Sequence, residues 1–201
     1  NEYHKFTVDE HSIRAVECAT ELMSDTGPAG EAYRNLRQKR TLHLALLLHD
    51  LGKGFADDHS DVAGRLADQT SALLRLPERE AETLNFLVSK HLYMAHAAFR
   101  HNLHDESLVV RFAFEVGSPE VLQMLYVLTC ADLSAVGPGV MNNWKLELLT
   151  DLYSRTRSYL TDDSPLESAR ERLRQCRRQL TEQVGDRRHA GWWAQQINSL
   201  P

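Results

Sequence analysis

The chain has 201 residues, of which 42% are apolar, and its formal net charge is -5. This length and apolar content allow one sizeable core without crosslinks, so we expect one domain with an appendage. The net negative charge excludes the strong positive field that recruits nucleic acid or an anionic membrane, so we predict neither as a partner.

Cysteine usage and hydropathy indicate the compartment. Cys18, Cys130 and Cys176 lie far apart in helical contexts, which favours reduced thiols over a disulfide framework. No early segment resembles a signal peptide, and the longest apolar run, around residues 44–48, is too short to span a bilayer. We therefore expect a soluble, cytoplasmic protein. Because the sequence begins with Asn1 rather than Met, we also expect it to be part of a longer polypeptide.

Apolar residues recur at helical spacing along nearly the whole chain, and no run alternates as a strand would. The sequence therefore predicts an all-α helical bundle. Thr7 and Glu10 have the spacing of a capping box, so we predict a first helix from there to a stop at Gly27, with His11 in its first turn. Its inward side chains are expected to be Ile13, Val16, Cys18 and Leu22.

A second helix is predicted over residues 31–50, apolar on nearly all sides toward its end, as a buried central helix would be. It delivers His49 and Asp50 at its C-terminal end. Glycines at 52 and 54 break it, and a short polar stretch leads into a third helix with His59 at its start, capped by Asp58 or Ser60.

Pro77 opens a fourth predicted helix, which ends near His91 and is followed by a less regular, histidine-rich stretch to Asp105. Its expected apolar face consists of Leu84, Leu87 and Val88. Three more helices are predicted over 106–116, 119–136 and 140–160. The middle one begins at Ser118 and Pro119 and carries Asp132 late in its course.

The last of these helices and the segment beyond it differ in composition. In the helix over 140–160, Trp144, Leu148 and Leu152 have core spacing. From residue 161 arginines and glutamates interleave, which indicates a solvated helical extension over 161–201.

Six residues form a candidate metal site. The motif HDLGKG lies at the end of an apolar helix. A histidine–aspartate pair alone is weak evidence for a metal site, but other potential ligands accompany it in this sequence. Imidazoles and carboxylates form a mixed nitrogen and oxygen ligand set, which favours manganese, iron, cobalt, nickel or zinc; magnesium in function is also possible. The predicted ligands are His11, His49, Asp50, His59, His91 and Asp132.

The adjacency of His49 and Asp50 suits a dinuclear centre, because one side chain can bind one ion while the carboxylate bridges two. Two cations about 3.5–4 Å apart can activate a water and stabilise the oxygens of an in-line displacement at phosphorus. The set therefore predicts phosphoester hydrolysis, with Asp50 central to catalysis. Lys53 and Arg100 are candidate phosphate-binding residues; the alternative for each is a solvated surface position.

Ordinary structural roles compete with ligation. A buried hydrogen-bonded network could explain the central histidines and aspartates, a helix cap could explain His59, and a surface position could explain His91. Ligation is favoured because ionisable residues aimed into an apolar bundle are costly to bury unless a metal satisfies them.

On these motifs the chain resembles the HD-domain superfamily of metal-dependent phosphohydrolases. Within it, the chain more closely resembles the uridylyl-removing domain of bifunctional uridylyltransferase/uridylyl-removing enzymes that act on the regulatory protein PII. The similar segments, in order, are YHKFTVDEHSIRAVE, LALLLHDLGKG, DHSDVAGRLA, LVSKHLYMAHAAFRHNLHD, FAFEVGSPEVLQMLYVLTCADLSAVGPG and NNWKLELLTDLYSRTR.

The resemblance implies an HD domain over 1–160 and a C-terminal extension over 161–201. It implies hydrolysis of the bond between UMP and a tyrosine of PII, in a chain that also carries nucleotidyltransferase and ACT domains. Many members of the family have a second histidine where this chain has Lys90, so the sequence leaves open whether the site binds one metal ion or two. A free-nucleotide phosphohydrolase and a degenerate, non-catalytic regulatory module are the alternatives.

Overall fold

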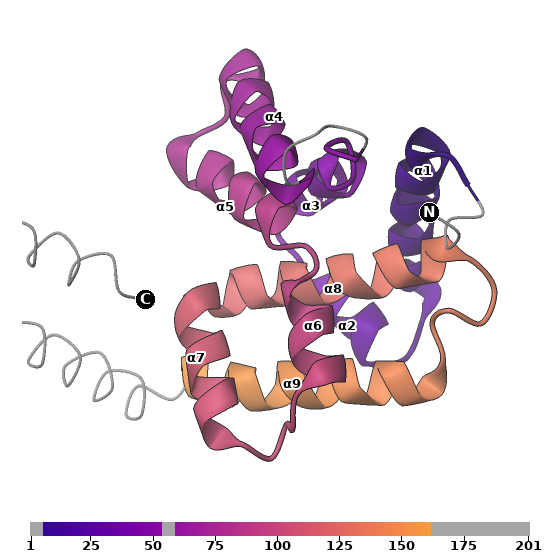
Figure 1. The fold of residues 1–201 in the computed structure, drawn as a ribbon, viewed down its shortest axis with the longest axis vertical. Coiled ribbons are helices and arrows are strands. Elements are labelled where there is room, and N and C mark those ends of the chain that lie inside the picture. Colours follow the sequence, from indigo (N-terminus) through magenta and orange to yellow (C-terminus); the bar gives the residue numbers. More distant parts are fainter. Residues whose placement is uncertain (1–5, 54–58, 162–201) are drawn as a thin grey trace, which may run out of the picture.

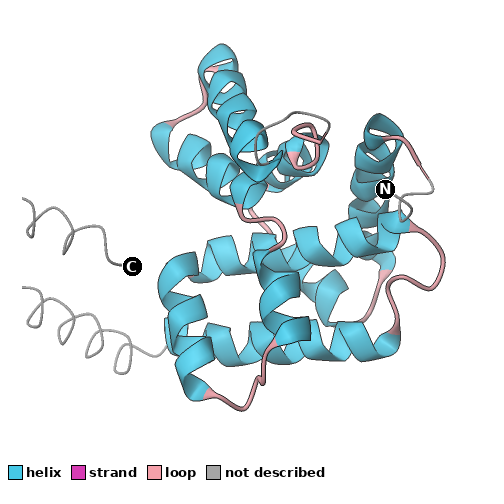
Figure 2. Ribbon diagram, in the orientation of Figure 1, coloured by secondary structure: helices cyan, strands magenta, loops and turns pink. Residues whose placement is uncertain are grey.

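The computed structural model describes residues 6–53 and 59–161, with side chains from residue 62 onward in the second range. Every element in these ranges is helical, as Figure 2 shows, which confirms the predicted all-α class. The elements are α1 (Val8–Glu21), η1 (Leu22–Ser24), α2 (Pro28–Asn35), α3 (Lys39–Leu48), α4 (His59–Leu74), α5 (Glu78–Ser89), α6 (Tyr93–Arg100), α7 (Glu106–Val116), α8 (Pro119–Val136) and α9 (Asn143–Thr161).

Two helices organise the bundle. Helix α8 is apolar on almost every side and packs against α1, α2 and α9, while α3 packs against α1, α5 and α8. Figure 1 shows α8 and α9 running alongside each other, with α3, α4 and α5 grouped on the opposite side of α8. Buried side chains from both groups belong to one continuous core. Residues on α1, α3, α5 and α8 can therefore meet in the interior.

The single helix predicted over 31–50 is wrong, because the structure has α2 and α3 with a break between them. Leu36 has extended backbone (ψ 128°) and buries its side chain in the core, so the chain leaves the helical path there. The Lys39 ammonium donates to the carbonyl oxygens of Arg34 and Leu36, at 3.1 and 2.8 Å. These bonds satisfy carbonyls that the end of α2 leaves without helical partners.

The stretch expected to be irregular after His91 contains α6. Its short apolar face, Met94, Ala97 and Ala98, is buried, and α6 packs against α8 and α9. Of the eight residues of α6, only His96 and Arg100 are strongly polar, so this short segment shows no clear apolar face in the sequence.

Two side chains predicted to face the core are exposed. Ile13 is 55% exposed and Trp144 is 59% exposed. The buried face of α1 instead consists of His11, Ser12, Ala15 and Ala19. Small residues at these positions let α1 lie directly on α8, which turns Ile13 outward.

Helix caps follow the sequence signals in part. Ser118 accepts a hydrogen bond from the Val121 N–H at 3.2 Å and Pro119 occupies the first turn of α8, as predicted. Thr7 is the N-cap residue of α1, but its side chain makes no capping hydrogen bond, so the capping box is not formed. The expected cap of the third helix lies outside the described residues. No helix in the described ranges is both long and apolar enough to cross a bilayer.

Candidate metal centre

The HDLGKG segment forms the end of α3 and a tight turn. Helix α3 ends at Leu48, and His49 is its C-cap residue. The Lys53 N–H then donates to the Asp50 carbonyl oxygen at 3.0 Å, so the chain folds back at once. His49 and Asp50 are fully buried (0% and 2% exposed), although they are polar. The apolar end of α3, with Leu46 and Leu48 buried, therefore carries an imidazole and a carboxylate into the centre of the bundle; Leu47 on its other side is 40% exposed, so the helix is not buried all round as predicted.

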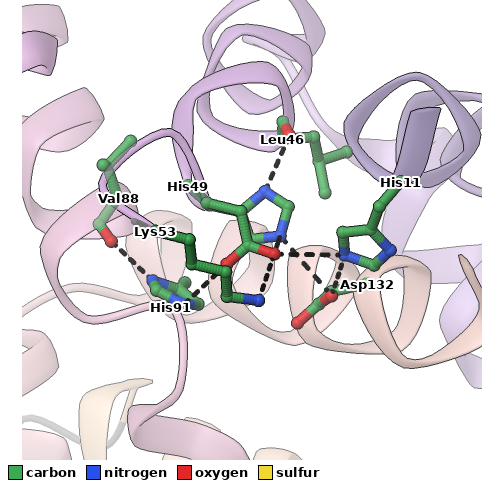
Figure 3. Close-up of polar contacts among 8 residues, drawn as sticks. His11, Leu46, His49, Lys53, Val88, His91 and Asp132 are labelled. Atoms are coloured by element: carbon green, nitrogen blue, oxygen red, sulfur yellow. Dashed lines mark hydrogen bonds and ion pairs between the residues drawn. The ribbon is translucent and has the colours of Figure 1, made fainter. Parts of the chain in front are cut away.

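His11 from α1 and Asp132 from α8 meet this pair (Figure 3). His11 Nε2 lies 2.9 Å from Asp132 Oδ1 and 3.6 Å from Asp50 Oδ2. His49 Nε2 lies 3.5 Å from each of the same two carboxylate oxygens. Ligand atoms of His11, His49 and Asp132 all lie within 4.8 Å of one another, which is close enough to share one ion.

His91 approaches Asp50 from the other side. It follows the C-terminal end of α5 and is 1% exposed. Its Nε2 lies 3.8 Å from Asp50 Oδ1, whereas His11 and His49 face Oδ2. The two oxygens of one carboxylate are therefore directed to different imidazoles, which is the arrangement that a bridging carboxylate needs.

Backbone carbonyls fix the orientation of two imidazoles. His49 Nδ1 lies 2.7 Å from the Leu46 carbonyl oxygen, and His91 Nδ1 lies 2.7 Å from that of Val88 (Figure 3). A carbonyl oxygen only accepts hydrogen bonds, so Nδ1 carries the proton in both rings. In the neutral form, Nε2 of each ring then directs a lone pair toward the carboxylates. This is how metal-binding histidines are held in proteins.

The donor set fits a cation. His49 Nε2 is buried and has no hydrogen-bond partner, although two carboxylate oxygens lie at 3.5 Å. A lone pair that faces negative oxygens in a dry interior is unfavourable unless a positive charge lies between them. A divalent ion bound by imidazole nitrogen and carboxylate oxygen supplies that charge.

The charge states also suit ligation. Burial alone would raise the pKa of Asp132, but His11 and His49 hold it far below its usual value. Burial likewise opposes ionisation of Asp50, yet His49 and Lys53 lower its pKa. Burial, reinforced by the neighbouring His49, lowers the pKa of His91 to about 4. Ionised carboxylates and a neutral imidazole are the forms that bind metal.

His49 is affected by opposing influences. Burial lowers its pKa, but the Asp132 and Asp50 carboxylates outweigh burial and raise it above the usual value. The same two carboxylates that raise this pKa would also favour a metal ion beside the imidazole.

Of the other predicted site residues, Lys53 joins the cluster and Arg100 does not. Lys53 Nζ lies 2.5 Å from Asp50 Oδ2. Arg100 is exposed at the far end of α6, which leads away from His91 toward α9 (Figure 1). The side chain of His59 lies outside the described residues, so its predicted ligation stays a prediction. Lys90, next to His91, turns away and pairs with Glu115 Oε1 at 3.1 Å.

Sequence reasoning missed the two carbonyls that orient the imidazoles. Leu46 and Val88 are each three residues before a site histidine, at the C-terminal end of a helix. Carbonyls in that position lack helical partners and are free to accept from a side chain. A histidine just beyond a helix, three residues after such a carbonyl, was the available signal.

Comparison with known proteins agrees with the resemblance inferred from the motifs. The family model described as "HD domain" matches residues 8–121. The chain is 38% identical over 189 residues to a bifunctional uridylyltransferase/uridylyl-removing enzyme of Rhodospirillum rubrum. It is 36% identical over 189 residues to the enzyme of the same name from Azospirillum brasilense. Each alignment covers 92% of this chain and 20% of the relative, so the chain spans about a fifth of their length.

A third relative, from Zymomonas mobilis, carries the same name and is 40% identical over 156 residues, which is 75% of this chain and 17% of the relative. The resemblance inferred from the motifs is thereby confirmed over most of the chain. The chain belongs to the HD domain family.

Proposed function

We propose that this chain is a metal-dependent phosphodiesterase that removes UMP from a uridylylated tyrosine of a PII-type protein. The observation that carries the proposal is the buried His49 Nε2, which has no hydrogen-bond partner and faces two carboxylate oxygens at 3.5 Å. The relatives named for uridylyl removal support the substrate class.

The chain offers positions for one ion or two. His11, His49, Asp50 and Asp132 would hold the first ion. Asp50 Oδ1 and His91 would contribute to a second, together with His59. When bound, such ions supply Lewis acidity toward a phosphoryl oxygen and a water of lowered pKa. Manganese, iron, cobalt, nickel and zinc all suit this ligand set, and magnesium in function fits its oxygen donors.

The chain's own residues position the reaction. The carbonyls of Leu46 and Val88 hold two imidazoles so that Nε2 faces the reacting centre. Lys53 pairs with Asp50 and its side chain is 30% exposed, so a substrate phosphate that approaches from solvent could contact its ammonium. A phenolate leaving group has a parent pKa of about 10, so it needs little help from a general acid.

The relatives are much longer than the part of them that this chain matches. Because the chain spans about a fifth of relatives that carry both activities, we propose that uridylyl transfer belongs to another part of the polypeptide. Nucleotidyltransferase and ACT domains are the neighbours that the resemblance implies, and PII is the protein partner.

The direct test uses metal-loaded protein and uridylylated PII. We expect UMP release that depends on the metal and is lost in His49→Gln. His43→Gln is the matched control, because His43 lies on the same helix and bonds instead to the Tyr33 hydroxyl at 3.0 Å. Release of UMP from free uridine nucleotides, but not from PII, would overturn the protein substrate. No hydrolysis of either with any of these metals would overturn the phosphodiesterase itself.

A further inference from the structure

Lys53 occupies a position on the ligand cluster that an ordinary loop lysine would not. It follows Asp50 by three residues, and the turn closed by the Lys53 N–H and the Asp50 carbonyl brings its side chain back over the carboxylate. Its Nζ lies 2.5 Å from Asp50 Oδ2. That oxygen is the one that faces His11 and His49, at 3.6 and 3.5 Å. The ammonium therefore contacts the ligand oxygen itself.

The surroundings make this contact electrostatically important. The Asp50 side chain is 3% exposed and that of Asp132 is 13% exposed, so solvent screens their two negative charges poorly. Lys53 brings an ammonium on a flexible stem, and its side chain remains 30% exposed. Its charge can thus compensate the carboxylates, and its side chain can still swing outward.

We propose that Lys53 is a built-in competitor of the metal, whose ammonium neutralises Asp50 in the metal-free protein and must yield this oxygen when an ion binds. The inference rests on the proposed metal site but not on the proposed substrate. A cation that binds the same oxygen meets a like charge, so Lys53 weakens metal binding and keeps the ion exchangeable. The displaced ammonium is then available to a substrate phosphate.

The test measures metal affinity without any substrate. Mn²⁺ binding to metal-free protein is followed by titration calorimetry for wild type, Lys53→Met and Lys53→Arg. We expect Lys53→Met to bind Mn²⁺ about tenfold more tightly and Lys53→Arg to stay within about twofold of wild type, because only the former removes the competing charge. Metal-free Lys53→Met should also melt at a lower temperature than metal-free wild type, since Asp50 loses its counter-charge.

Lys90→Met is the matched control. Lys90 also lies beside a candidate ligand, His91, but its ammonium pairs with Glu115 and its side chain is 45% exposed. We expect its Mn²⁺ affinity to remain within about twofold of wild type. Unchanged or weaker Mn²⁺ binding in Lys53→Met would overturn the proposal, as would equal tightening in Lys90→Met. Absence of Mn²⁺ binding in every variant would overturn the metal site as well, whereas loss of UMP release with intact binding would concern the substrate alone.

Discussion

On helix α8, the polar side chains of Tyr126 and Asp132 have different surroundings. The Tyr126 hydroxyl lies 2.8 Å from Thr150 Oγ1, which in turn donates to the Leu146 carbonyl oxygen at 2.7 Å. In these two successive hydrogen bonds, each hydroxyl donor has an acceptor within the protein. Asp132, further along α8, instead faces imidazoles, of which His49 has a buried nitrogen without a hydrogen-bond partner.

The contrast distinguishes a polar side chain that only stabilises the fold from a polar cluster that could bind a ligand. Tyr126 also stacks on Tyr153 with ring centroids 4.5 Å apart, so its surroundings are complete without any further group. Under the proposed metal site, a cation completes the cluster around Asp132. Buried polar groups therefore point to function when the protein itself leaves them unsatisfied.

The largest effect is expected from Asp50→Asn. The substitution keeps the shape of the side chain but removes the charge that faces three histidines, so metal binding and UMP release should both fall by about a thousandfold or more. Metal analysis and a rate assay check this outcome. Asp151→Asn, in an exposed pair with Arg155 on α9, is the control and should leave both unchanged. Full metal content in Asp50→Asn would contradict the assignment.

Removal of the metal should be felt as lost stability. A ligand present at a thousand times its Kd stabilises the folded state by about 4 kcal/mol, so chelation should lower the unfolding free energy of wild type by that order. Asp50→Asn should show no such decrease. Denaturant titrations with and without chelator measure it. An equal chelator effect in both proteins would place the bound ion elsewhere.

Tyr126→Phe should lower stability without changing metal binding. It removes the hydrogen bond between the Tyr126 hydroxyl and Thr150 Oγ1 and should lower the unfolding free energy by about 1 kcal/mol, while Mn²⁺ affinity stays at the wild-type value. Urea titration and calorimetry give the two quantities. If the affinity fell together with the stability, the two regions of α8 would not be independent.

The smallest effect is expected from His43→Gln. His43 lies on α3 with His49, but it is only half-buried and its Nε2 meets the Tyr33 hydroxyl at 3.0 Å. Loss of this bond should change the unfolding free energy by less than about 1 kcal/mol, with no change in metal content. Thermal melts and metal analysis provide the check. A drop in metal content would show that a histidine on α3 affects metal binding even when its side chain does not face the carboxylates.

The residue types at the site made its convergence predictable. An aspartate and a histidine at the end of an apolar helix, a histidine in a first turn and an aspartate late in another apolar helix are all costly to bury separately. The structure brings His11, His49, Asp50, His91 and Asp132 together. Arg100 could not be placed in this way, because the solvated end of a short helix imposes no such cost.

Helix boundaries and orientations were less predictable. The break at Leu36 depends on the burial of one side chain in an extended conformation, which is a tertiary contact. The outward turn of Ile13 depends on the close approach of α1 to α8 through alanines. Periodicity records which residues are apolar, but it does not record which partner helix can come nearest.

The most direct test is a crystal structure of the metal-loaded protein with diffraction data collected at the absorption edge of the metal. We expect an anomalous peak within bonding distance of His49 Nε2 and of oxygens from Asp50 and Asp132, with His49 Nδ1 still bonded to the Leu46 carbonyl. A cluster with no anomalous peak in protein shown to contain metal, or a peak at another place in the molecule, would contradict it.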